Sequence, residues 1–261
     1  MGAKTELLVF ADADIADALR RCEACDPAAA EALVRRLAPG WDVELADGEV
    51  LGEATYPPAD TVYALSIPGL DLVCGLRFLR GGASSLPEHV LAEGVGRRVV
   101  YHRMHSGTDS VELALWDDGA LVRAIGIDGV NGVVEDVGDP LPFEAPFWAG
   151  EHPHEPEKFI VDAGPSPFPT PFHPLDFGNE AVRALFGFIV EGRRLPGDVD
   201  PSTVHLQGFR VTDPEAPTLA ERQARMRESA VPMTLTSYRM EKAPDGRILM
   251  IPGEFNLADY Q

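Results

Sequence analysis

Two neighbouring segments rich in proline and aromatic residues constrain the fold more than any other feature of this chain. Residues 140–153 read PLPFEAPFWAGEHP, and residues 165–174 read PSPFPTPFHP. Proline fixes φ and has no backbone N–H to donate, so these segments are excluded from helix interiors and from central strands. Their phenylalanine and tryptophan side chains carry apolar surface that is costly to leave in water. The pattern predicts an ordered, extended arm that is held in place by its aromatic side chains.

The rest of the sequence predicts an α+β fold with a mostly antiparallel sheet. Residues 97–127 contain three strand-like runs, and Asp118-Gly119 at the second turn between them is a hairpin signal. Asp47-Gly48 predicts another hairpin, within residues 41–54. The run ELLVFA at residues 6–11 is typical of a buried strand. We expect helices on one face of this sheet and the proline-rich arm wrapped around it.

Helix signals and turn-rich stretches suggest how the chain is organised. Residues 27–38 follow Asp26 as an N-cap and begin with Pro27, both typical of a helix start. The most amphipathic stretch, residues 179–191, predicts a helix that ends at Gly192. We expect a main domain at residues 1–196. A C-terminal extension or subdomain at residues 197–261 would contain a strand at 204–211 and a final hairpin.

The charge of the chain narrows the classes of partner. Its formal net charge is −20, and the acidic excess is largest between residues 101 and 200. A field of this sign repels phosphate backbones and anionic membrane surfaces, so we expect neither nucleic acid nor a membrane as a partner. The N-terminus shows neither a secretory signal nor a spanning segment, and three cysteines make no complete disulfide framework. These features predict a cytoplasmic protein.

Asp12-Ala13-Asp14 follows the first predicted strand directly and is the nearest approach to a catalytic motif. It resembles the opening motif of haloacid-dehalogenase-type phosphotransferases, in which the first Asp is the nucleophile and the second is a general acid–base. The later acidic pair that this chemistry needs has a counterpart only in Asp198 and Asp200, which do not follow an apolar strand. An Asp between a strand and a helix is also an ordinary N-cap. Asp12 and Asp14 therefore remain weak catalytic candidates.

Glu151 to Glu155 (EHPHE) concentrates imidazoles and carboxylates that can ligate zinc or iron. His152 and His154 are the candidate ligands, and His102, His105 and His173 can join them if the fold brings them near. His102 and His105 are three residues apart on a predicted strand, so their side chains point to opposite faces and cannot both ligate one ion. The same residue types are equally typical of a solvated turn. No metal and no cofactor are predicted.

The aromatic arm itself has two interpretations. Its side chains can fold back and cover the protein's own core, as is usual for long loops in compact domains. Alternatively, Phe147 and Trp148 line a pocket or a partner-facing groove, with Glu151 and His152 at its rim. These four residues are the candidate binding residues.

Several segments together resemble an uncharacterised family of actinobacterial proteins. The most specific is FEAPFWAGEHP at residues 143–153, and the resemblance extends from about Gly2 to Gly192. The other segments are GAKT (2–5), ALVRRL (32–37), YPP (56–58), PFHPL (171–175) and LFGFIVEG (185–192). The resemblance implies a bacterial cytosolic setting, and it transfers no catalytic or binding residue.

Two functional hypotheses follow from these residues. The first is a non-catalytic binding or regulatory module that uses the aromatic arm to hold a protein or a small molecule. The alternative is a metal-dependent hydrolase or phosphotransferase that combines Asp12 and Asp14 with His152 and His154. The alternative requires these four side chains to converge on one pocket. The oligomeric state is open.

Overall fold

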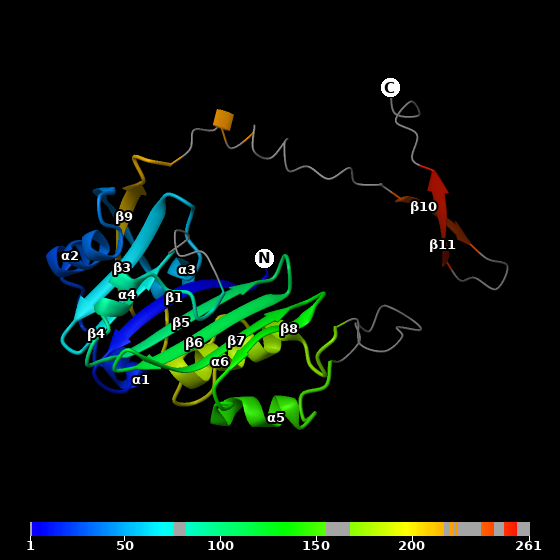
Figure 1. Cartoon of the computed structure of the whole chain (residues 1–261), viewed down its shortest axis with the longest axis horizontal. Helices are drawn as coiled ribbons and strands as arrows, with labels where there is room; N and C mark the ends of the chain where they lie inside the picture. The colour runs from blue at the N-terminus through cyan, green and yellow to red at the C-terminus, as the bar shows by residue number, and fades with distance from the viewer. Residues whose placement is uncertain are drawn as a thin grey trace. The chain divides into compact units, whose positions relative to one another are not determined.

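The computed structural model divides the chain into two compact units, residues 1–214 and residues 215–261 (Figure 1). The described residues are 2–75, 82–154, 168–216, 220–221, 223, 236–242 and 248–254. In the second unit, β10 (Thr236–Lys242) and β11 (Ile248–Glu254) form the antiparallel hairpin that the sequence predicts. The expected strand at 204–211, by contrast, belongs to the first unit.

A nine-stranded sheet forms the centre of the first unit, in the order β2-β9-β3-β4-β1-β5-β6-β7-β8. Every neighbouring pair is antiparallel, which confirms the α+β class. The strands are β1 (Lys4–Ala11), β2 (Asp42–Val50), β3 (Thr61–Ile67), β4 (Leu70–Cys74), β5 (Arg98–His105), β6 (Ser110–Asp117), β7 (Ala120–Asp128), β8 (Gly132–Val137) and β9 (His205–Thr212).

Strand β1 lies near the middle of this sheet and is buried on both faces. Leu7 and Val9 enter one hydrophobic core, whereas Leu8 and Phe10 enter the other. Successive side chains of a strand point to opposite faces, so a continuous apolar run is what a strand covered on both sides requires. This explains why residues 6–11 lack the alternation of a half-exposed strand.

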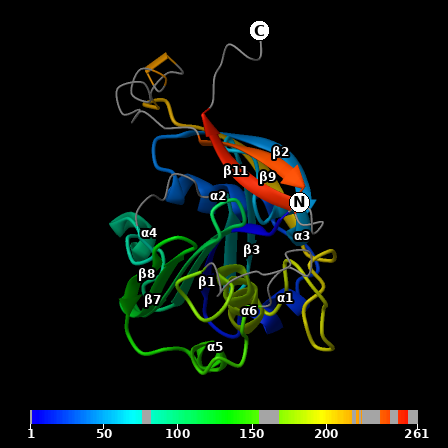
Figure 2. The same cartoon turned by 90° about the vertical axis from the view of Figure 1, so that its right-hand side faces the viewer.

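Helices cover both faces of the sheet, so the expectation that they lie on one face only is wrong. One core contains side chains of α1 (Ile15–Arg20), α3 (Leu51–Ala54), α5 (Ala145–Trp148) and α6 (Pro174–Phe186). The other core contains side chains of α2 (Pro27–Leu37) and α4 (Glu88–Ala92). Figures 1 and 2 show α5 and α6 on their side of the sheet, where α6 packs against β5 and β6. No helix of the described residues is long and apolar enough to cross a membrane.

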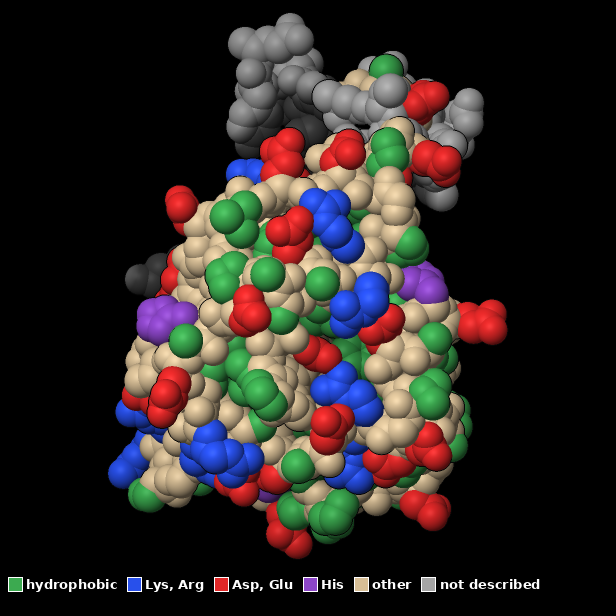
Figure 3. All heavy atoms as spheres, turned by 90° about the vertical axis from the view of Figure 1, so that its left-hand side faces the viewer, with side chains coloured by type: hydrophobic (Ala, Val, Ile, Leu, Met, Phe, Trp, Pro, Cys, Tyr) green, Lys and Arg blue, Asp and Glu red, His purple; other side chains and the backbone are tan. Residues whose placement is uncertain are grey.

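The face that carries α2 is polar where it meets solvent. Arg35 pairs with Glu31 within α2, and Arg36 connects α2 to Glu93 at the end of α4. Figure 3 shows acidic and basic side chains interspersed on this side of the molecule. Such mixed charge keeps an exposed helix face in water without creating a field of one sign.

Residues 41–54 form one strand and a short helix, so the predicted hairpin at Asp47-Gly48 is wrong. Strand β2 continues through this dipeptide with a register shift between Ala46 and Glu49. The Gln207 side-chain amide donates to the Ala46 carbonyl at 2.6 Å, and Gly208 leaves room for the backbone of Asp47. A bulge on an edge strand, stabilised by its neighbour β9, has therefore replaced a local turn.

Helix α6 begins earlier and ends earlier than the predicted 179–191. Pro174 occupies its first turn, and the His173 imidazole Nδ1 accepts the Leu175 N–H at 3.1 Å as an N-cap. Gly187 ends the helix in the left-handed conformation with φ +80°. Proline is tolerated at a first turn because the N–H it lacks has no helical partner there.

The proline-rich arm is partly helical. Pro142–Glu144 form a 3₁₀ turn (η1), and Ala145–Trp148 form the single turn α5. Its prolines occupy first-turn positions, so the exclusion from helix interiors holds while the expectation of an extended arm does not. Residues 155–167 of the arm lie outside the described residues.

Candidate functional site

A buried ion pair attaches the arm to the sheet. Arg123 on β7 is 1% exposed and Glu144 is 0% exposed, and two 2.8 Å hydrogen bonds join them in a bidentate pair. Arg123 also donates to Asp136 and to the carbonyls of Val137 and Gly138. Burial alone lowers the pKa of Arg123, but the hydrogen bonds and charges of Glu144 and Asp136 raise it above its ordinary value. The guanidinium is therefore charged and holds η1 against the edge of the sheet.

Aromatic side chains then hold α5 against α6. Phe147 is 2% exposed and makes edge contacts with Phe172 and Phe177, with ring centroids 5.2 and 5.3 Å apart. The rings of Phe172 and Phe177 are themselves stacked at 5.4 Å. This cluster joins two segments of the chain separated by about twenty-five residues, so the residues that follow α5 lie beside the start of α6.

Trp148 packs against other residues of the proline-rich arm. Its indole N–H donates to Glu144 at 3.3 Å, and its ring makes an edge contact with Phe172 at 4.9 Å. Its side chain is 37% exposed and does not line the groove described next. Of the four candidate binding residues, Phe147, Glu151 and His152 do line it.

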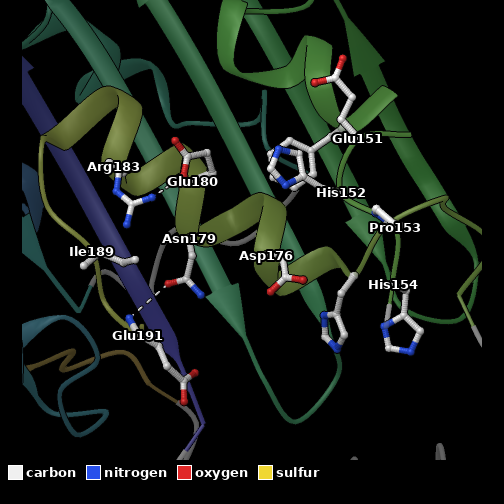
Figure 4. A pocket seen from close by; sticks show the side chains of 12 residues that line it. Glu151, His152, Pro153, His154, Asp176, Asn179, Glu180, Arg183, Ile189 and Glu191 are labelled. Atoms are coloured by element: carbon white, nitrogen blue, oxygen red, sulfur yellow. Dashed lines mark hydrogen bonds and ion pairs between the residues drawn. The ribbon is translucent and has the colours of Figure 1, made fainter. Parts of the chain in front are cut away.

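A groove of about 720 Å³ lies between α6 and residues 151–154 (Figure 4). Asp176, Asn179, Glu180 and Arg183 project from α6, and His152 and His154 come from the segment after α5. The described residues that line the groove are Phe147, Glu151, His152, Pro153, His154, His173, Asp176, Asn179, Glu180, Arg183, Ile189 and Glu191. The sequence did not indicate the contribution of α6, because only the tertiary packing brings that helix to the arm.

Three imidazoles gather along this groove. The His152 ring is stacked on Phe147 with centroids 4.4 Å apart and planes at 22°. The His154 ring lies 5.5 Å from that of His173 and makes an edge contact with Phe168 at 5.2 Å. The structure therefore brings His173 to His154, as the sequence allowed.

The capping bond of His173 disfavours this histidine as a metal ligand. Because Nδ1 accepts the Leu175 N–H, the proton of the neutral ring sits on Nε2 and makes that atom a donor. The nitrogen that binds a metal needs a free lone pair, and the second ring nitrogen of a metal-binding histidine usually donates a hydrogen bond. In His173 this arrangement is reversed, because Nδ1 accepts a hydrogen bond and Nε2 carries the proton. Among the described residues, no group of three His, Cys, Asp or Glu side chains has the geometry to hold a metal ion.

Most of the charged side chains in the groove already have partners. Arg183 donates to Glu180 at 2.6 Å and to the Arg193 carbonyl at 3.2 Å, and its Nε lies 3.5 Å from Asp198. Glu191 accepts from the Ala3 N–H at 3.2 Å. Two side chains differ from these, because the carboxylate groups of Asp176 and Glu151 make no hydrogen bond or ion pair among the described residues.

Asp12 and Asp14 occupy a different part of the molecule. Asp14 is the N-cap of α1 and accepts the Asp17 N–H at 2.8 Å. Asp12 pairs with Arg97 at 2.6 Å and lines a separate hollow of about 400 Å³. This hollow shares no lining residue with the groove beside α6. The convergence that the enzymatic hypothesis requires is thus not found in these two hollows.

Two further histidines lie on β5, away from the groove. His102 is fully buried and its Nδ1 lies 2.8 Å from the Thr5 hydroxyl. Burial lowers the pKa of His102 to about 3, against a smaller opposing effect of the Gly178 backbone. His105 makes an edge contact with Tyr56 at 5.6 Å, and its Nδ1 accepts the Gly107 N–H.

The fold and the groove define an α+β protein with a ligand-sized polar groove on one face of a fully antiparallel sheet. The chain belongs to a family of unknown function, DUF6928, whose model matches residues 5–209. The match begins in β1 and ends in β9, so it spans the whole sheet. This confirms the resemblance to an uncharacterised family. No curated protein and no solved structure matches the chain.

Proposed function

We propose that this protein is a non-catalytic binding module that holds a small ligand in the groove beside α6. The observation that carries the proposal is the groove itself, a hollow of about 720 Å³ that is lined by three imidazoles from two separate segments of the chain. Ligand sites of this size are usually preformed, with a few polar groups that converge on an apolar wall. Pro153 and Ile189 supply apolar surface here.

The support around the groove favours binding over catalysis. The Arg123–Glu144 pair and the phenylalanine cluster hold α5 and α6 on the sheet, so the lining residues rest on buried elements. A preformed site loses less conformational entropy when a ligand binds. The weak catalytic candidates Asp12 and Asp14 already serve in an ion pair and an N-cap.

We infer a cytosolic and bacterial setting for this module. Cys22, Cys25 and Cys74 are all free thiols, which suits a reducing compartment. The net charge of −20 favours a small-molecule or protein partner over nucleic acid.

A fragment screen followed by two-dimensional NMR tests the proposal. With a library of mixed charge, we expect bound fragments to shift the amide signals of Glu151, His152 and His154 and of the first turns of α6. His152→Ala removes an exposed ring that covers Phe147, and it should weaken such binding about threefold to tenfold.

His205→Ala is the matched control, because it makes the same substitution at an exposed position on β9 that does not line the groove. It should leave fragment binding unchanged. A library whose members shift no groove signal, or shift it equally in both variants, would overturn the proposal.

A further inference from the structure

The link between α1 and α2 contains two cysteines, neither of which lines the groove beside α6. Cys22 and Cys25 lie between Arg20, the end of α1, and Pro27, the start of α2. Both side chains are half-buried, and both pack against the core on the α6 side of the sheet. Because the two residues are three positions apart in the sequence, the reach of the chain keeps their Cα atoms within about 11 Å of each other.

This link carries the chain from one face of the sheet to the other. Ile15 and Leu19 of α1 belong to the core on the α6 side, whereas Leu33 of α2 belongs to the opposite core. Cys25 packs against both cores, and its thiol donates to the Ala64 carbonyl on β3 at 3.6 Å. A bond between the two sulfurs would therefore form at the point where the chain changes faces.

The two ends of the link are held by hydrogen bonds, whereas its middle is not. The Cys22 N–H donates to the Leu19 carbonyl at 3.2 Å, and the Asp26 carboxylate accepts N–H groups in the first turn of α2. Glu23 and Ala24 are exposed, and neither takes part in a backbone hydrogen bond with the described residues. A bend at these two residues brings the cysteines to the Cα separation of a disulfide, about 4.4–6.8 Å, without breaking a helix hydrogen bond.

The two thiols of the link also interact electrostatically. Burial raises the pKa of Cys22, and the negative charge of a Cys25 thiolate raises it further. The repulsion between two charges weakens with distance, so this effect agrees with two sulfurs that lie near each other. Cys74 is different, because it is completely buried in the interior strand β4, where burial holds the pKa of its thiol well above the ordinary value. Cys74 therefore serves as an unreactive comparison within the same chain.

A metal ion is the other partner that a C-x-x-C pair can bind. Structural zinc requires four nitrogen or sulfur ligands in a tetrahedral arrangement. Among the residues that the structure describes, no third His, Cys, Asp or Glu joins the pair to form such a group. The arrangement of Cys22 and Cys25 therefore favours thiol–disulfide chemistry over metal binding.

We propose that Cys22 and Cys25 are a redox-sensitive pair, which a small disulfide such as oxidised glutathione converts into a reversible disulfide within the chain. The thiolate of one cysteine attacks a sulfur of the small disulfide, forms a mixed disulfide and releases one small thiolate. The thiolate of the other cysteine attacks the protein-bound sulfur, forms the Cys22–Cys25 bond and releases the second small thiolate. Two electrons pass from the pair to the oxidant, and the two protons of the protein thiols end on the released thiolates.

Equilibration of the folded full chain with mixtures of reduced and oxidised glutathione tests this proposal. Acid quenching and alkylation in denaturant, followed by intact-mass measurement, count the remaining thiols and the bound glutathione, and peptide mapping locates the bridge. We expect the wild type to form a bridge between Cys22 and Cys25 of the same chain while Cys74 stays reduced. An excess of reduced glutathione should reverse the reaction.

Cys22→Ser and Cys25→Ser each remove one partner of the pair with little change in size. Each variant should stop at the mixed disulfide and accumulate at least about tenfold more of it than the wild type, because no neighbouring thiol displaces the glutathione. Cys74→Ala is the control, since it removes a thiol outside the link and should form the bridge as the wild type does. A wild type that accumulates as much mixed disulfide as the serine variants, bridges only between two chains, or keeps three thiols in oxidised glutathione alone would overturn the proposal.

Discussion

Arg123 connects the sheet edge to the arm through contacts that are almost completely buried. Its guanidinium reaches two carboxylates and two backbone carbonyls, and the arm residue Glu144 also accepts from the Leu141 N–H at 2.9 Å. A buried ion pair contributes little net stability compared with apolar residues, but removal of one partner leaves a buried charge without compensation. The pair therefore has its greatest effect on where the arm sits.

Glu144→Gln should lower the free energy of unfolding by about 3 kcal/mol, as for other buried pairs that lose one partner. Asp117→Asn is the comparison, because its partner Arg98 and Asp117 itself are about half exposed. That substitution should cost less than about 1 kcal/mol. Urea titrations of both variants measure the difference, and equal costs would show that Arg123 is not anchored as described.

His102 is a buried histidine that folding keeps neutral, since burial lowers its pKa to about 3. The unfolded chain binds a proton at this residue below a pH of about 6.5, whereas the folded chain does not until about pH 3. Its contribution to stability is therefore complete above pH 6.5 and is lost as the pH falls through this window. The limiting slope is about 1.4 kcal/mol per pH unit.

His102→Gln should remove this dependence and keep a hydrogen-bonding group near Thr5. We expect the free energy of unfolding of the variant to fall less than that of the wild type between pH 6.5 and pH 5. Denaturation series across this range give the comparison. Parallel curves would mean that His102 titrates in the folded protein as it does in the unfolded chain.

At the scale of elements, α6 depends on residues at both of its ends. His173 caps its start, and Gly187 ends it at φ +80°, a conformation that glycine adopts without a steric penalty. A Cβ at Gly187 would lie 2.2 Å from the Cβ of Ala16, which is a residue of α1. The glycine thus allows both the helix end and its close approach to a neighbouring segment.

Gly187→Ala should cost about 3 kcal/mol of unfolding free energy, because it adds a steric overlap to the unfavourable φ. Gly40→Ala isolates the effect of the unfavourable φ. Gly40 has φ +83° and no atom within 4 Å of an added Cβ, so we expect a cost of about 1 kcal/mol. Thermal or urea unfolding distinguishes the two variants, and similar costs would argue against the contact with Ala16.

At the scale of the whole molecule, the sheet is completed by a strand that comes late in the chain. Strand β9 lies between β2 and β3 and pairs with both, so it connects these two early strands to each other. In the part of the chain that the structure describes, β9 is the only sheet partner of β2. The sequence alone predicts this strand within a C-terminal extension that begins at residue 197.

Truncation after Pro214 should leave a folded protein whose free energy of unfolding is within about 1 kcal/mol of the full chain, because all nine strands remain. Truncation after residue 196 removes β9 and should prevent cooperative folding. Circular dichroism and urea unfolding of both forms make the comparison. A folded 1–196 form would instead support the domain boundary after residue 196 that the sequence predicts.

Local signals predicted those elements whose ends are set by nearby residues. Helix α2 has the predicted Asp26 cap, with N–H donors at Ala28 and Ala29, and the β5–β6–β7 meander turns at Asp118-Gly119 with both φ values positive. The Asp47-Gly48 hairpin failed because β9 pairs along β2 and stabilises a bulge instead. A turn rule considers only neighbouring residues, so it cannot take into account a strand partner that begins at residue 205.

The candidate site divides in the same way. Local chemistry identified His152, Glu151 and the aromatic arm, since proline and phenylalanine are rare together in a soluble chain. It did not identify Arg123, which is an isolated charge in a strand, nor the α6 residues that complete the groove. Nothing in the spacing of these residues shows that they meet.

By itself, the sequence determined the acidic charge, the class of fold, the strands with clear turns and the prolines that confine the arm to short turns. These properties depend on each residue and its neighbours along the chain. Only the tertiary structure decided that helices cover both faces, that β9 joins β2 to β3, and that α6 meets residues 151–154. Those outcomes depend on which apolar surfaces and buried charges find each other across long distances in sequence, because that packing stabilises the fold.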